Sequence, residues 1–203
     1  MELQGKLRCI LPAKRYIHSL GVQYTAANLA MRYGYDIKTA ELAGLLHDCA
    51  KYMSDDEMLS ECIKYHIPVT PIEEENSFLL HSKLGAFYAK NVYDIKDEEI
   101  IDAITYHTTG RPGMTALGKI IFIADYIEPS REEIDGLPEI RKISYDDLDK
   151  TVYLILDNTL NYLNEVCKRR IDPMSQKAFE YYKNLNYHYN IKESVNEYSK
   201  SND

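Results

Sequence analysis

The sequence is poor in several features that would mark a particular class of protein. It has 203 residues, no tryptophan and only four cysteines. Cys9, Cys49, Cys62 and Cys167 lie far apart and form no CxxC pair. This spacing disfavours a disulfide framework or a zinc knuckle, and it favours reduced thiols in a cytoplasmic protein.

Long apolar runs and an excess of basic residues are also missing. Charged residues interrupt the first segment, MELQGKLRCILPAKR, so we expect neither a secretory signal nor a membrane span, and no membrane partner. The formal net charge is -8. Because sequence-independent binding to DNA or RNA needs a basic surface, no nucleic-acid polymer is expected as a partner. A small anion could still bind where metal ions or a few cations gather in one cleft.

The glycine-rich loops that cradle phosphates are absent as well, since neither GxxxxGK[ST] nor GxGxxG occurs. A nucleotide would therefore be held through metal rather than through backbone amides. No segment alternates convincingly in the manner of a strand, and the apolar periodicity is helical nearly throughout. With 45% hydrophobic residues, the chain is expected to be an all-α protein whose core could enclose a site.

The periodicity predicts a series of helices with a few connecting segments. The expected helices cover residues 3–11, 22–33, 39–52, 78–93, 97–107, 115–128, 145–170 and 173–189, with another starting at the Ser54/Glu57 capping box. Residues 68–77 and 108–114 are expected as a loop and a turn, and residues 129–144 as a mobile surface connection. We expect a metal-binding core over 1–130, C-terminal helices packed on the same domain over 131–190, and a frayed tail over 191–203.

The positions of the histidines are the most informative feature. His47 and Asp48 are adjacent at the end of the most hydrophobic predicted helix. Burying both without a partner would cost several kcal/mol, whereas a divalent cation would neutralise the acid and bind the imidazole. The alternative is a helix end whose polar residues simply face solvent, and the pair alone favours that alternative. Asp125 is likewise a carboxylate within an apolar segment, IIFIADYIEP, and would need a partner if buried. A cap or a buried salt bridge could account for it as well as a metal ion.

Five motifs in one order resemble the YqeK-type branch of the HD superfamily: RYIHSLGV, LAGLLHDCAK, LLHSKLGA, ITYHTTGRPGM and KIIFIADYIEPSR. Members of that branch with an assigned activity are symmetrical diadenosine tetraphosphate hydrolases. The resemblance is strong over residues 11–131 and implies an HD-domain helical bundle around a buried metal site. Cys49 and Ser82 depart from the usual residues beside two motifs, but neither replaces a ligand.

The resemblance also implies the metal ligands and the metal. One ion would be held by His18, His47, Asp48 and Asp125, and a second by Asp48, His81 and His107, with Asp48 bridging. Two divalent ions are therefore expected, with iron as the first choice and manganese or another six-coordinate ion as alternatives. His66 and His188 match no ligand motif and are expected to be structural.

Three cations are candidates for contact with a phosphate. Lys51 follows Asp48 by three residues, and Arg111 follows His107 in a turn; together with Asp48 they are the predicted catalytic residues. Lys51, Arg111 and Arg131 are the predicted substrate-binding residues. The structural alternatives to phosphate contact are that Lys51 is a solvated surface side chain and that Arg131 forms a surface ion pair.

These expectations combine into a function: a metal-activated water cleaves diadenosine tetraphosphate symmetrically into two ADP. The polyphosphate comes from the resemblance, because the residues alone indicate only an anionic ester or anhydride. Another nucleotide phosphohydrolase (a nucleotidase or a phosphodiesterase), a non-catalytic metal-bearing nucleotide sensor and a metal-free structural protein are the alternatives. The tyrosine-rich late helices could pair two subunits as a homodimer, or could equally close the core.

Overall fold

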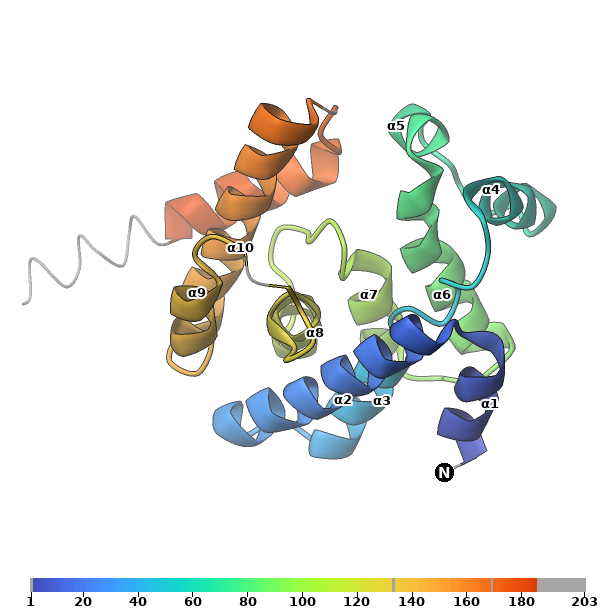
Figure 1. Ribbon diagram of the computed structural model, residues 1–203, viewed down its shortest axis with the longest axis horizontal. Coiled ribbons are helices and arrows are strands. Elements are labelled where there is room, and N and C mark those ends of the chain that lie inside the picture. Colours follow the sequence, from blue (N-terminus) through green and yellow to red (C-terminus); the bar gives the residue numbers. More distant parts are fainter. Residues whose placement is uncertain (1, 133, 169, 186–203) are drawn as a thin grey trace, which may run out of the picture.

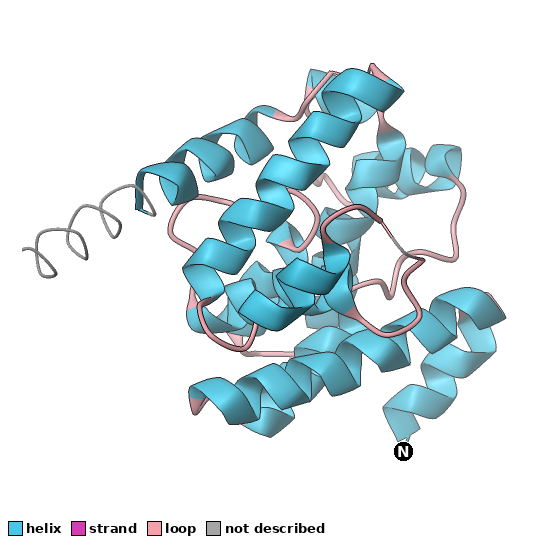
Figure 2. Cartoon of the chain, turned by 60° about the vertical axis from the view of Figure 1, so that its left-hand side comes forward, coloured by secondary structure: helices cyan, strands magenta, loops and turns pink. Residues whose placement is uncertain are grey.

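The computed structural model describes residues 2–132, 134–168 and 170–185, and all of their regular structure is helical (Figures 1 and 2). The expected all-α fold is thereby confirmed. In chain order the elements are α1 (Glu2–Ile10), α2 (Ala13–Tyr33), α3 (Ile37–Leu46), α4 (Asp55–Lys64), α5 (Pro71–Glu75), the 3₁₀ turn η1 (Ser77–Leu79), α6 (Leu80–Asn91), α7 (Glu98–Tyr106), α8 (Ala116–Ile127), α9 (Leu137–Ile143), α10 (Leu148–Tyr162), the π-helical turn η2 (Leu163–Cys167) and a helix over 173–185.

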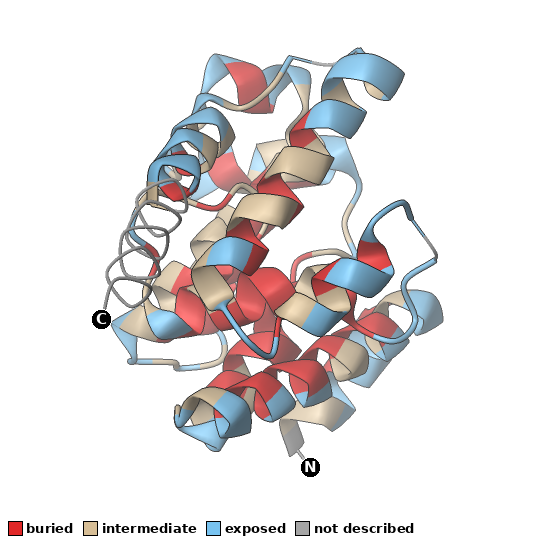
Figure 3. Cartoon of the chain, turned by 90° about the vertical axis from the view of Figure 1, so that its left-hand side faces the viewer, coloured by how far each residue is buried: buried red, intermediate tan, exposed pale blue. Residues whose placement is uncertain are grey.

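The central helix is α8, which is apolar on most of its sides. Its buried residues face α2, α3, α7 and α10, all of which pack against it. Figure 1 shows α2 and α3 on one side of α8 and α9 and α10 on another, and Figure 3 shows buried residues on the inner faces of the helices. Among the described residues, no helix is both long and apolar enough to cross a bilayer. All four cysteines are free thiols.

The helix expected over 39–52 is shorter than predicted, because α3 ends at Leu46 and His47 is its C-cap. Residues 47–52 form turns instead, in which Cys49 N–H donates to Leu46 O and Lys51 N–H donates to Asp48 O. Apolar residues continue beyond Leu46, so the pattern alone gave no stop signal. The early ending turns the backbone so that His47 and Asp48 both face the same space.

Two segments expected to lack structure contain helices. Within residues 68–77, a capping box between Thr70 and Glu73 starts α5 at Pro71. Within residues 129–144, expected as a mobile connection, α9 buries Leu137 and Ile140 against the core. Both predictions were wrong because short helices draw their stability from capping and packing rather than from a long apolar pattern. The helix expected over 145–170 is divided into α10 and η2, and His188 and the tail 191–203 lie outside the described residues.

Gly44 allows α3 to lie unusually close to α2. A Cβ atom at this position would be 3.1 Å from the Cα of Gln23 and 3.1 Å from Val22 O, both of which belong to the backbone of α2. The contact matters for the site because α2 carries His18 and α3 leads into His47. The two imidazoles can meet only if the two helix axes stay near one another.

We expect Gly44→Ala to lower the free energy of unfolding by about 1–3 kcal/mol, since backbone atoms cannot yield to the new methyl group. Gly5→Ala is the matched control, because nothing lies within 4 Å of a Cβ atom built there. On helix propensity alone it should raise stability by about 0.5–1 kcal/mol. Urea unfolding of both variants measures the difference. Equal stability of the two would show that α2 and α3 are not constrained by this contact.

Candidate metal centre

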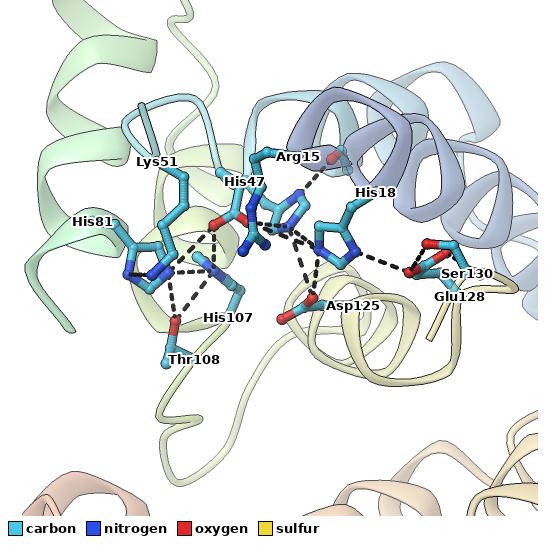
Figure 4. A network of polar contacts seen from close by, with 12 residues as sticks. Arg15, His18, His47, Lys51, His81, His107, Thr108, Asp125, Glu128 and Ser130 are labelled. Atoms are coloured by element: carbon cyan, nitrogen blue, oxygen red, sulfur yellow. Dashed lines mark hydrogen bonds and ion pairs between the residues drawn. The ribbon is translucent and has the colours of Figure 1, made fainter. Parts of the chain in front are cut away.

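The six predicted ligands come from five parts of the chain and lie close together, and Figure 4 labels all of them except Asp48. His18 lies within α2, His47 caps α3 and Asp48 begins the turn after it. His81 lies in the first turn of α6 and His107 caps α7. Asp125 lies in α8 and is the most exposed of the six, with 19% of its side chain accessible.

Asp48 lies between two pairs of histidines. Its Oδ2 atom is 3.4 Å from His47 Nε2 and 3.8 Å from His18 Nε2. Its Oδ1 atom is 3.3 Å from His81 Nε2 and 3.6 Å from His107 Nε2. Asp125 Oδ1 joins the first pair, at 3.0 Å from His18 Nε2 and 3.8 Å from His47 Nε2. Two groups of donor atoms are compact enough to hold a metal ion: His18 with His47 and Asp125, and His47 with Asp48 and His107.

Hydrogen bonds on the outer side of each ring determine which nitrogen faces inward. His47 Nδ1 lies 2.7 Å from Gly44 O, and His107 Nδ1 lies 2.7 Å from Ile104 O. His81 Nδ1 contacts Phe78 O in the same way, so each of these three rings donates to the carbonyl three residues earlier. A carbonyl oxygen can only accept, so the proton is on Nδ1 and the lone pair of each neutral ring is on Nε2.

His18 lies in the middle of a helix and uses a carboxylate instead. Its Nδ1 atom is 3.0 Å from Glu128 Oε1, and Glu128 also accepts from the N–H and the hydroxyl of Ser130. Gly21 leaves the room that this carboxylate needs, because a Cβ atom there would collide with Glu128 Oε2. Such carboxylate–histidine contacts orient metal ligands and raise their basicity.

The inward-facing atoms carry lone pairs that lie close together, and a cation between them would stabilise this arrangement. His18 Nε2 and His47 Nε2 are 3.3 Å apart, and His81 Nε2 and His107 Nε2 are 3.1 Å apart. Neutral rings with Nδ1–H would bring lone pairs together at these distances. Asp48 Oδ1 is buried and has no hydrogen-bond partner among the described residues. This arrangement fits divalent metal binding.

The pKa shifts favour a neutral His81 and ionised carboxylates, whereas the shift at His18 favours its protonated form. Burial lowers the pKa of His81 to about 3, so this imidazole is uncharged at neutral pH. Burial would lower the pKa of His18 too, but hydrogen bonds to Asp125 and Glu128 outweigh it and raise that pKa. Burial opposes ionisation of Asp48 and Asp125, yet neighbouring imidazoles hold both pKa values below the usual range. Nitrogen and carboxylate donors of this kind suit six-coordinate divalent ions.

The structure brings two of the three predicted phosphate contacts to the cluster. Lys51 Nζ lies 3.0 Å from His81 Nδ1, and Arg131 Nη2 lies 2.6 Å from Asp125 Oδ1. Arg111 is not brought there: its Nε and Nη2 atoms pair with Asp102 at 2.9–3.2 Å, and Nη1 donates to the carbonyls of the following turn. The structure therefore gives no support to the role predicted for Arg111. His66 is exposed and lies outside the cluster.

Three functional candidates escaped the sequence analysis. Arg15 donates from Nη1 to Asp48 Oδ2 at 2.6 Å, and Glu128 orients His18. Thr108 Oγ1 lies 3.1 Å from the Nε2 atoms of His81 and His107. A signal was available for the first two, since Arg15 precedes His18 by three residues and Glu128 follows Asp125 by three, which places each pair on one helix face.

A cavity of about 760 Å³ adjoins the cluster. Four cationic side chains line it near the ligands, together with the acidic Glu128 and Glu132, and the rest of the lining is mostly apolar, aromatic or hydroxyl-bearing. The four cations are Lys14, Arg15, Lys51 and Arg131. The cavity is large enough for a small organic ligand. Its cationic side would attract an anion despite the net negative charge of the chain.

The HD domain family matches residues 15–130. The symmetrical bis(5'-nucleosyl)-tetraphosphatase of Bacillus subtilis is 40% identical over 166 residues, which cover 80% of this chain and 88% of that protein. The protein of the same name from Staphylococcus aureus is 44% identical over 155 residues, covering 75% and 79%. A crystal structure of a predicted HD superfamily hydrolase involved in NAD metabolism from Clostridium acetobutylicum is similar with a TM-score of 0.86 and 39% identity, covering 91% of this chain and 96% of that one.

We expect Glu128→Gln to weaken metal binding about 10–100-fold, since the amide cannot accept from His18 and Ser130 as the carboxylate does. Metal affinity is measured by competition with a chelator of known strength. Glu132→Gln is the control, because it removes a charge nearby but its side chain is 88% exposed. If both variants bound metal like the unaltered protein, Glu128 would not support the ligand.

Proposed function

The chain belongs to the HD domain family, and on this premise we propose that it is a metal-dependent hydrolase that cleaves diadenosine tetraphosphate symmetrically into two ADP. The activity for which its relatives are named supports the substrate. The observation that carries the proposal is the position of Asp48, whose two oxygens face two different pairs of imidazoles. A bridging carboxylate in a dinuclear site needs this arrangement.

We propose that two divalent ions bind here, with iron the first candidate and manganese the second. His18, His47, Asp48 and Asp125 would hold one ion, and Asp48, His81 and His107 the other. When bound, such ions supply Lewis acidity and lower the pKa of coordinated water towards neutrality. The absence of thiolate from the cluster agrees with this choice, since Cys49 instead donates to Gly85 O, and burial raises the pKa of its thiol.

The cations around the cluster would bind and orient the polyphosphate. Lys51 lies beside the His81 and His107 pair, and Arg131 lies beside Asp125 on the opposite side. An anhydride held between them would have its negative charge offset on both sides. Burial lowers the pKa of Lys51, although nearby carboxylates counteract part of that effect.

Arg15 is the cation best placed to contact the reacting phosphate. It lines the cavity, and one of its nitrogens pairs with Asp48. Its other nitrogens have no hydrogen-bond partner among the described residues. Arg111, by contrast, has all three of its nitrogens engaged. A guanidinium with free donors beside a phosphate site offers the geometry that oxyanions prefer.

Product analysis tests the function. Protein purified without oxygen and analysed for metal should convert diadenosine tetraphosphate to ADP alone, and removal of the metal with a chelator should abolish turnover. Asp48→Ala serves as the negative control and should lose both turnover and most of the metal. ATP together with AMP would exclude symmetrical cleavage. Preferential turnover of dGTP or a cyclic dinucleotide would favour another phosphohydrolase, and tight nucleotide binding without any product would favour a sensor.

Arg15→Gln should raise the KM for diadenosine tetraphosphate and lower kcat/KM by about 10–100-fold, because a charge-assisted contact of about 1.5–3 kcal/mol is lost. Metal content should stay unchanged, and added guanidinium should restore part of the rate. Arg32→Gln is the matched control, on the same helix but with its charge near Asp146. A loss of metal from Arg15→Gln without rescue would mean that Arg15 only supports Asp48.

Four expectations remain predictions. They are that no nucleic-acid polymer is a partner, that the chain could form a homodimer, that the protein is cytoplasmic, and that the domain boundaries lie where the sequence placed them. They do not enter the mechanism.

A further inference from the structure

The outer side of α2 carries exposed apolar side chains at an even spacing. The helix packs on α3 and α8 with its inner side, and it lies at the edge of the molecule in Figure 1. On its outer side Ile17, Tyr24 and Met31 are 58%, 55% and 57% exposed. Each follows the one before by two helical turns less about 20°, so the three side chains form one row along the helix. We refer to these three residues as the α2 stripe.

No charged side chain interrupts the α2 stripe. The sequence from Tyr16 to Met31 contains no Asp, Glu, Lys or Arg, although 28% of the whole chain is charged. A surface helix of a soluble protein normally has charged or polar residues on its outer face, and a helix that is apolar on all sides is normally covered. Exposed apolar surface of this kind marks a site of protein–protein contact. We therefore expect another protein surface to cover α2 in solution.

The α2 stripe has the symmetry that pairing with a second copy of the chain requires. Tyr24 lies midway between Ile17 and Met31. In a two-fold contact between antiparallel α2 helices, Tyr24 meets Tyr24 of the other copy, and Ile17 meets Met31 of the other copy. Beyond the two ends of α2, Ile10 and Ile37 are 41% and 39% exposed and are almost equally far from Tyr24 in the sequence. They would extend the same self-complementary contact.

Charge also favours α2 as the surface through which two copies approach. Each copy has a formal net charge of -8, so most faces would bring like charges together, whereas two α2 stripes bring none. The contact is small, because a helix of 21 residues is about 31 Å long and about 10 Å wide. A stable complex buries about 800 Å² on each partner. Association through α2 should therefore be reversible, with a dissociation constant of about 1–100 μM.

We propose that the α2 stripe is the contact between two copies of this chain, which pair with their α2 helices antiparallel about a two-fold axis at Tyr24. The contact does not depend on the proposed function, since none of the three residues is a predicted metal ligand or lines the cavity. His18 is buried on the inner side of the same helix. The second copy would therefore cover the outer side of a helix that supplies a predicted ligand.

Sedimentation equilibrium of the metal-loaded full chain, between about 1 and 200 μM, measures the association. Tyr24→Glu places two carboxylates at the two-fold axis and should raise the dissociation constant about 100-fold or more, because like charges then face each other. Ile63→Glu is the matched control. It adds the same charge at an apolar side chain that is 64% exposed on α4, outside the α2 stripe, and it should leave the dissociation constant unchanged.

An exchange of charges tests the antiparallel register. Ile17→Lys and Met31→Glu should each weaken the association about tenfold or more, because each sets a charge against an apolar side chain of the other copy. The double variant should regain most of the affinity, since the two introduced charges are of opposite sign and face each other across the contact. Within one chain the two positions are about 21 Å apart along the helix, so no contact inside one copy explains the recovery.

Three results would overturn the proposal. An unaltered chain that stays a monomer up to about 200 μM would leave the α2 stripe to a different partner. A dimer that tolerates Tyr24→Glu would pair through another surface, such as the late helices. Association that both single variants weaken and the double variant does not regain would exclude the antiparallel register. Recovery in the double variant also shows that the loss in the single variants is a loss of pairing and not of folding.

Discussion

The buried carboxylate of Asp48 is the constraint on which the rest of the structure depends. Only 2% of the residue is exposed, yet neighbouring imidazoles hold its pKa well below the usual value for aspartate. An anion in such a place is destabilising by several kcal/mol unless positive charge and hydrogen-bond donors surround it. Arg15 supplies one donor, and the Nε2 atoms of four histidines surround the remaining space. The helices are arranged so that these side chains can meet there.

Helix ends are the means by which the fold delivers the ligands. His47 and His107 both cap helices, and both bond to a carbonyl three residues earlier. A helix leaves its last carbonyls without intrahelical partners, so each imidazole satisfies one of them and is oriented by it. His18 has no such carbonyl within α2 and depends on Glu128 from the end of α8. At His47 and His107, one local hydrogen bond therefore both caps the helix and orients the ring. At His18 the ring is oriented by a tertiary contact instead.

This difference explains how much could be predicted from sequence. The all-α class follows from periodicity, and the ligands could be named because five short motifs resemble those of the HD superfamily in the same order. The end of α3 at Leu46 could not be read, since nothing in the apolar pattern stops there. Arg111 illustrates the same limit: its turn was correctly located, but its pairing with Asp102, nine residues earlier, depends on how α7 and the turn pack. Arg15 had a periodic signal, yet only the fold shows that Asp48 is its partner.

The arrangement also separates two requirements that a nucleotide hydrolase must meet. The predicted ligands and the cations proposed to bind phosphate come from α2, the helix ends and α8, all within or beside the matched family region. The apolar side of the cavity needs α10, which is tied to α8 by Asn158 and Lys119 rather than by any ligand. Substitutions at Ile155 or Thr159 could therefore change which organic group fits without moving a metal ligand. Because α8 carries Asp125 together with the cavity-lining Phe122 and Tyr126, it links the apolar side of the cavity to the predicted metal ligands.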